Sequence, residues 1–226
     1  MDYTKKKPAL WKIITLCLVS AMLNQVPVYT LTGIPLYLDT VFTIAVFFSL
    51  GLIPAIITGI FLHLLFVQLL LIPAVHMFVY GTDPAQMHIT WHLFVLCIIV
   101  EILLVHYFHK RWLKGQEAVF LAKPTLNSFI GMVPLLLMLT ALVCIAVSIT
   151  GGIIGFFLTQ YNATRLYAPE YIFIVGLLRN NISILASAIL SRIPINTVDR
   201  FFVIFGGYGI SLLYRKWLNL TPRFSG

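Results

Sequence analysis

Apolar residues run along most of the chain in long stretches that polar residues interrupt at only a few places. Several stretches approach or exceed about 20 residues, the length that a helix needs to cross a bilayer. They lack the alternation of apolar and polar residues that marks a membrane barrel. Because backbone groups in lipid must bond within the chain, helices are the expected spanning form. The pattern predicts an all-α integral membrane protein.

We predict six membrane-spanning helices from these stretches. Their approximate ranges are 9–28, 38–50, 55–75, 88–108, 133–158 and 201–213, with a turn at 51–54 and a basic loop at 109–114. A further apolar stretch at 171–190 is broken by Arg179, Asn180 and Asn181. Polar backbone at membrane depth is tolerated where it lines a cavity or is covered by protein. We therefore expect 171–190 to be an outer segment that enters the membrane only partly.

Positive charge is distributed along the chain in a way that indicates its orientation. The net charge is +8, and eleven of the fifteen Lys and Arg residues lie before or at the start of the first span, in the 109–123 region or after the last span. Lys and Arg next to spans are retained in the cytoplasm. Both termini are therefore predicted inside (N-in/C-in), in a multi-pass protein of a bacterial or archaeal cytoplasmic membrane.

Composition narrows the class of function. The chain is 60% hydrophobic and 10% charged, which excludes an ordinary soluble domain. A single membrane domain over 1–226 leaves no room for a soluble catalytic domain. Nucleotide-binding loops, nucleophile elbows and DNA-binding motifs are not found in the sequence. We expect no enzyme activity, no cofactor and no nucleic-acid partner, with the three cysteines acting as packing residues.

Glu101 lies near the middle of the predicted fourth span. An ionisable side chain at that depth is costly, and it is a functional hypothesis by default. It predicts a solute contact or a proton-linked role. The alternative is a protonated or paired glutamate that holds helices together.

Histidines gather at the outer end of the same span. His88 and His92 are four residues apart and share a helical face, and His76 could approach them across a short loop. Three histidines could bind a transition metal, but no HExxH motif or cysteine pair supports a metal site. His92 and Trp91 fit either a solute-lining role or an interfacial belt.

Other polar residues are predicted near the outer face. Asp39 opens the second span, where it caps the helix or contacts solute. Asn196 is predicted to cap the last helix and Asp199 to lie near its positive end, either as a plain helix start or as the mouth of a pocket. The predicted substrate-binding set is Asp39, Trp91, His92, Glu101, Arg179, Asn181, Asn196 and Asp199.

Short motifs resemble the S components of energy-coupling-factor (ECF) transporters. They are Pro-Leu-Tyr-Leu-Asp-Thr at 35–40 with Gly51, Pro54 and Gly59, Thr-Gly-Gly at 150–152 with Gly155, and Ile-Pro-Ile-Asn-Thr-Val-Asp-Arg at 193–200. The resemblance implies six helices and a pocket near the outer face that captures a vitamin or similar micronutrient. It also implies a transmembrane coupling protein and two ATP-hydrolysing subunits as partners. The first helix carries Cys17 and Ala21 where family members often have two alanines.

The expected function is therefore the substrate-capturing membrane subunit of an ECF-type uptake transporter, with membrane lipid around it. The alternative is a small-molecule-sensing receptor module coupled to a signalling partner. A neighbouring gene for a coupling protein and ATPases would favour the first, and one for a kinase or phosphatase would favour the second.

Overall fold

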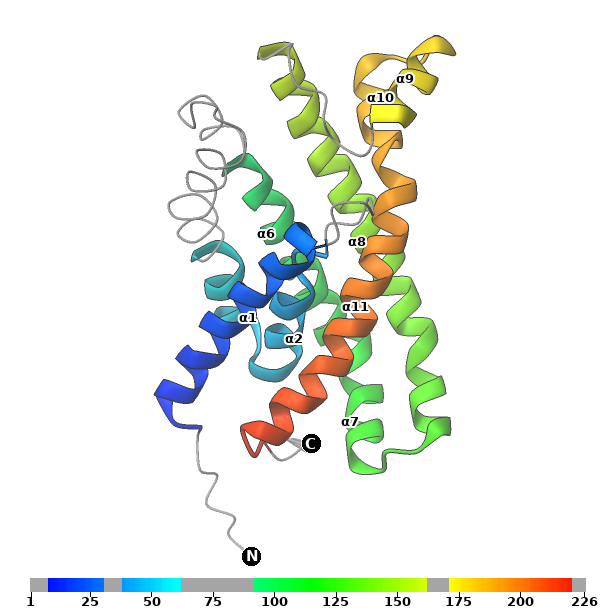
Figure 1. The fold of residues 1–226 in the computed structure, drawn as a ribbon. Coiled ribbons are helices and arrows are strands. Elements are labelled where there is room, and N and C mark those ends of the chain that lie inside the picture. Colours follow the sequence, from blue (N-terminus) through cyan, green and yellow to red (C-terminus); the bar gives the residue numbers. More distant parts are fainter. Residues whose placement is uncertain (1–7, 31–37, 62–91, 162–170, 221–226) are drawn as a thin grey trace, which may run out of the picture.

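The structure is a computed structural model that describes residues 8–30, 38–61, 92–161 and 171–220. Within these ranges the regular structure is helical and contains no strand, so the all-α prediction is confirmed. Figure 1 shows an elongated bundle of helices that run up and down its long axis. The start of α1, the end of α11 and α7 lie at one end of the bundle, and α9 and α10 lie at the other.

The described helices fall into three groups along the chain. The first group is α1 (Leu10–Thr30), α2 (Val41–Leu50), α3 (Leu52–Ile56) and the π-helical turn η1 (Ile57–Phe61). The second is the 3-10 turn η5 (His92–Phe94), α6 (Val95–Phe108), the π-helical turn η6 (His109–Leu113) and α7 (Lys114–Ala122). The third is α8 (Leu126–Tyr161), α9 (Tyr171–Arg179), α10 (Ile184–Leu190) and α11 (Arg192–Trp217).

The long helix α8 has one buried face. Its buried apolar residues recur every three or four positions, at Met132, Leu136, Leu139, Val143 and Val147. This is the spacing of one side of an α-helix. The predicted start near residue 133 was wrong, because the helix begins at Leu126. The Thr125 hydroxyl accepts the backbone N–H of Ser128 (3.3 Å) and so caps the first turn.

Close packing of α11 against α2 and α8 forms the centre of the core. A Cβ added at Gly207 would lie 2.9 Å from both the side chain of Ile44 and the carbonyl oxygen of Val41, so glycine allows α11 to approach α2. Tyr208 is fully buried beside the ring of Phe48, with ring centroids 5.3 Å apart. These contacts fix the relation between α2 and α11.

Two predicted connections differ from the structure. The basic loop predicted at 109–114 is helical, and η6 joins α6 to α7 without a break. The turn predicted at 51–54 is confined to Gly51, which has a φ of 96°, while Pro54 lies inside α3. Glycine permits this left-handed backbone without strain. The predicted interruption of 171–190 is confirmed, since α9 ends at Arg179 and α10 begins at Ile184.

Only one helix in the described ranges is long and apolar enough to cross a membrane, at Leu126–Phe157. The apolar helices Leu10–Asn24 and Val41–Leu50 are shorter. The six-span arrangement therefore stays a prediction.

Candidate functional site

The last helix carries the central residue of the site, Arg200, as the ninth of its 26 residues. The predicted Asn196 cap was wrong, because α11 already begins at Arg192 and Asn196 lies inside it. Pro194, the third residue, did not delay the start. Proline is tolerated in a first turn, where its missing N–H would have no helical partner.

Arg200 uses both ends of its guanidinium group. Its Nη1 donates to Oε2 of Glu101 (2.6 Å) and to Oγ1 of Thr40 (2.7 Å). Its Nη2 lies 2.9 Å from Oδ2 of Asp199 and 3.5 Å from Oδ1 of Asp39. We call these five residues the Arg200 cluster. It joins α6 and α11 to the two residues that precede α2.

The Arg200 cluster is largely shielded from solvent. Glu101 is 1% exposed, Asp199 is 0% and Arg200 is 4%, whereas the Asp39 side chain is 30% exposed. Asp199 also accepts the backbone N–H of Leu38 through Oδ1 (2.7 Å), which fixes the approach to α2. Buried charges require such pairing because desolvation penalises each of them. Asp39 is the member through which the cluster meets the surface.

Acidic side chains outnumber basic ones in the cluster. Three carboxylates surround one guanidinium group. Within the described part of the chain, Oε1 of Glu101 is buried and has no hydrogen-bond partner. The same residues do not include a set of three or more His, Cys, Asp or Glu side chains placed to hold a metal ion. The cluster can therefore still accept a hydrogen bond or a positive charge.

The structure brings together only some of the predicted site residues. Asp39, Glu101 and Asp199 meet at Arg200. Asn196 lies one turn earlier on α11 and donates to Ser148 of α8 (2.9 Å), so it faces a different helix. Arg179 and Asn181 are exposed at the connection between α9 and α10, where Asn181 has a φ of 61°. The binding roles of these residues stay predictions.

The remaining two predicted residues lie at the edge of the described chain. Trp91 falls outside the described residues. His92 begins η5, and its side chain is not among those described. The histidine group suggested by the sequence, with His76 and His88, also falls outside the described ranges.

The sequence-based set omitted Arg200, the residue at the centre, and Thr40. The signal was present, since Arg200 directly follows Asp199 and precedes an apolar run. What the sequence could not show is that α11 turns this side chain toward Glu101, which is 99 positions away.

A second arginine of α11, Arg192, lies against α8 at two glycines. A Cβ added at Gly151 would lie 3.2 Å from Nη1 of Arg192, and one at Gly155 would lie 3.1 Å from Nη2. The guanidinium carbon also lies 5.5 Å from the centre of the Phe94 ring. Because neither glycine has a Cβ, the two positions make room for the guanidinium group.

A separate polar group lies toward the opposite end of the bundle. Glu117 of α7 accepts from Nη2 of Arg215 (2.7 Å) and contacts Nε2 of His109 (2.6 Å). Arg215 also donates to the carbonyl oxygen of Phe48, near the end of α2. We call Glu117, His109 and Arg215 the Glu117 cluster. It lies about 22 Å from Arg200 along α11, at 1.5 Å per residue.

Comparison of the chain with models of protein families, with curated proteins and with solved structures found no match.

Proposed function

We propose that this chain is a helical membrane protein that captures a small solute at the Arg200 cluster. The exposed side of α8 supports a membrane location. Exposed apolar side chains recur there at Met138, Leu142, Ile145, Ile149, Ile153 and Phe157. At 1.5 Å per residue this row is about 29 Å long, close to the roughly 30 Å of a bilayer's hydrocarbon core. Large exposed apolar surfaces are rare on soluble monomers.

The proposed topology has six spans with both termini inside and 171–190 as a partly inserted outer segment. In support, the start of α1 and the end of α11 lie at the same end of the bundle as α7. The exposed Lys110, Arg111 and Lys114 belong to the connection that leads to this end. The positive-inside rule assigns that end to the cytoplasm.

The Arg200 cluster is the observation that carries the proposed solute site. Ionisable residues within a membrane domain are expensive to bury and mark substrate or ion pathways. Arg200 lies about 12 Å from the start of α11 and about 26 Å from its end, so the cluster lies nearer the proposed outer face. Partly exposed Asp39 gives it a route to the surface.

The chemistry of the cluster favours a solute with a cationic group or strong hydrogen-bond donors. Such a group would complement the excess of carboxylates and the unpartnered Oε1 of Glu101. A paired buried charge is far less costly than an unpaired one. The chemistry of the cluster therefore indicates a class of solute, and the experiment below identifies the molecule.

The resemblance to ECF transporter S components supplies a proposed biological setting. In that setting the solute is a vitamin-like micronutrient, and energy comes from a transmembrane coupling protein and ATP-hydrolysing subunits. The sequence itself contains no nucleotide-binding motif, which agrees with energy supplied by partners.

The test begins with mass spectrometry of small molecules that co-purify with the detergent-solubilised protein, followed by titration calorimetry with the molecule found. Glu101→Gln should weaken binding by about 10- to 150-fold, the range expected for losing a charged hydrogen bond. Glu117→Gln is the matched control, because Glu117 is also a buried, paired glutamate but lies in the other cluster. Equal affinity in wild type and Glu101→Gln would remove the proposed site.

A further inference from the structure

One continuous helical rod, formed by η5, α6, η6 and α7, changes its outward chemistry along its length. The exposed side chains of its first part are apolar, at Leu93, Leu96 and Leu103. Next come two exposed aromatic residues, Tyr107 and Trp112. Three exposed basic residues accompany and follow them, namely Lys110, Arg111 and Lys114. The apolar part therefore gives way to a mixed aromatic and basic segment at 107–114, which is followed on α7 by exposed Val119.

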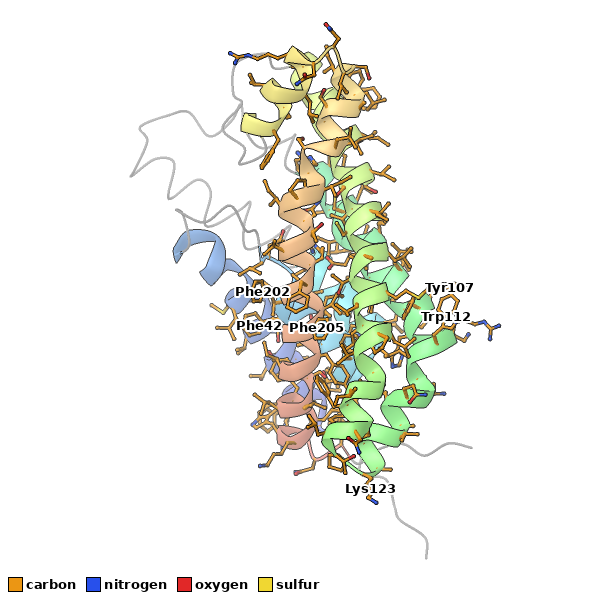
Figure 2. All side chains as sticks on the ribbon, turned by 90° about the vertical axis from the view of Figure 1, so that its right-hand side faces the viewer. Phe42, Tyr107, Trp112, Lys123, Phe202 and Phe205 are labelled. Carbon is orange, nitrogen blue, oxygen red and sulfur yellow. The ribbon has the colours of Figure 1, made fainter. Side chains whose placement is uncertain are left out.

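The aromatic residues form a defined pair. The rings of Tyr107 and Trp112 meet edge to face, with centroids 5.8 Å apart. They are five residues apart and would diverge on a regular α-helix, but the π-helical turn η6 brings residues at this spacing closer together. Figure 2 shows the two side chains projecting together from the outer side of the bundle.

The basic residues face outward, while both acidic residues of the same rod, Glu101 and Glu117, are buried. Glu117, on α7, is 4% exposed and pairs with Arg215 and His109. Across the described residues, no ion pair is formed by Lys110, Arg111 or Lys114. The exposed charged residues of the rod are therefore all basic.

We propose that Lys110, Arg111 and Lys114 bind the phosphate groups of anionic phospholipids, with Tyr107 and Trp112 at the boundary between headgroups and hydrocarbon. Tyrosine and tryptophan concentrate at this boundary because their rings are apolar and their tips are polar. Basic residues just beyond it are attracted to anionic lipids. The proposal rests on the membrane location proposed above and adds a lipid class to it.

The first test measures lipid preference by native mass spectrometry of the full-length protein with phosphatidylglycerol or phosphatidylcholine. Wild type should retain phosphatidylglycerol preferentially. In the Lys110→Gln/Arg111→Gln variant the preference for phosphatidylglycerol should be about 25-fold lower than in wild type, at about 5-fold for each charge removed. Lys123→Gln/Lys216→Gln removes two exposed charges outside the patch and should retain most of it. No preference in wild type, or equal losses in both variants, would overturn the proposal.

The second test separates failure of the lipid site from failure of the membrane location. Single cysteines at Leu103 and Lys114, in a chain with Cys17, Cys97 and Cys144 replaced by alanine, are exposed to a water-soluble thiol reagent in phosphatidylglycerol-containing liposomes permeabilised to the reagent. We expect Lys114→Cys to react and Leu103→Cys to be protected. Rapid reaction at both would refute the membrane location. Reaction at Lys114→Cys with protection of Leu103→Cys, but without a preference for phosphatidylglycerol, would refute only the proposed headgroup site.

Discussion

Gly207 offers a sharp test of the packing between α2 and α11, the two helices that bring Thr40 and Arg200 together. A Cβ added there would lie 2.9 Å from Cγ2 of Ile44 and 2.9 Å from the carbonyl oxygen of Val41. A backbone oxygen cannot rotate away, so Gly207→Ala must push the helices apart. Overpacking of this kind costs about 1–3 kcal/mol.

The same helix contains its own controls. A Cβ at Gly206 would lie 3.7 Å from the nearest side chain, and one at Gly209 would meet no heavy atom within 4 Å. Each Gly→Ala change also gains about 1 kcal/mol of helix propensity. That gain cancels when Gly207→Ala is compared with Gly209→Ala, which leaves the steric cost of about 1–3 kcal/mol.

The comparison is made by thermal unfolding of the detergent-solubilised variants, followed by loss of the monodisperse peak in size-exclusion chromatography. A 1 kcal/mol change shifts Tm by about 2–4 °C in a chain of this size. Gly207→Ala should therefore unfold about 2–12 °C below Gly209→Ala. If Gly207→Ala is as stable as Gly209→Ala, α11 does not approach α2 as closely as described.

Three further changes test other contacts. Arg200→Met leaves three carboxylates without their cation and should destabilise the protein by about 3–5 kcal/mol, which should lower the yield of monodisperse protein. Adding Glu101→Gln should restore part of that yield. No recovery would argue against the pairing of Arg200 with Glu101. Asn24→Ala removes the side chain that accepts from the backbone N–H of Phe42 (2.8 Å) and should cost about 1–3 kcal/mol in thermal unfolding, against no change for exposed Asn127→Ala. Ser183→Ala removes the cap of α10 and should cost about 0.5–2 kcal/mol locally, raising hydrogen exchange in α10 but not in α8.

The helical content and several helix boundaries could be predicted from the apolar pattern, because each helix has an apolar face or an apolar central stretch. Where a boundary depends on a local capping bond, the pattern was insufficient. Thr125 and Ser128 start α8 earlier than its apolar run suggests. The basic run at 109–114 has the composition of a loop, yet it continues a helix because the inward side of that helix carries buried Leu113 and Glu117.

The candidate site was also predictable only in part, and here the reason is not a capping bond. Glu101, Asp39 and Asp199 attracted attention individually because each is an acid within or beside an apolar run. Their meeting point depends on the rotation of three helices about their axes, which residue type alone does not determine. Asn196 illustrates this, because it lies one turn from Arg200 on the same helix and yet bonds to Ser148 of α8.

The short helix α2 has an electrical role that follows from its ends. Its 10 residues span only about 15 Å, and the Arg200 cluster adjoins its first turn while Arg215 donates to Phe48 in its last turn. The aligned peptide dipoles place partial positive charge beside the carboxylates and partial negative charge beside Arg215, and each match is favourable by about 0.3–2 kcal/mol. α2 thus helps the Arg200 cluster to tolerate its three acidic side chains around one arginine. The Arg200 cluster and Arg215 lie at the two ends of the same helix dipole, so a change of charge at either end of α2 alters the electrostatic potential at the other.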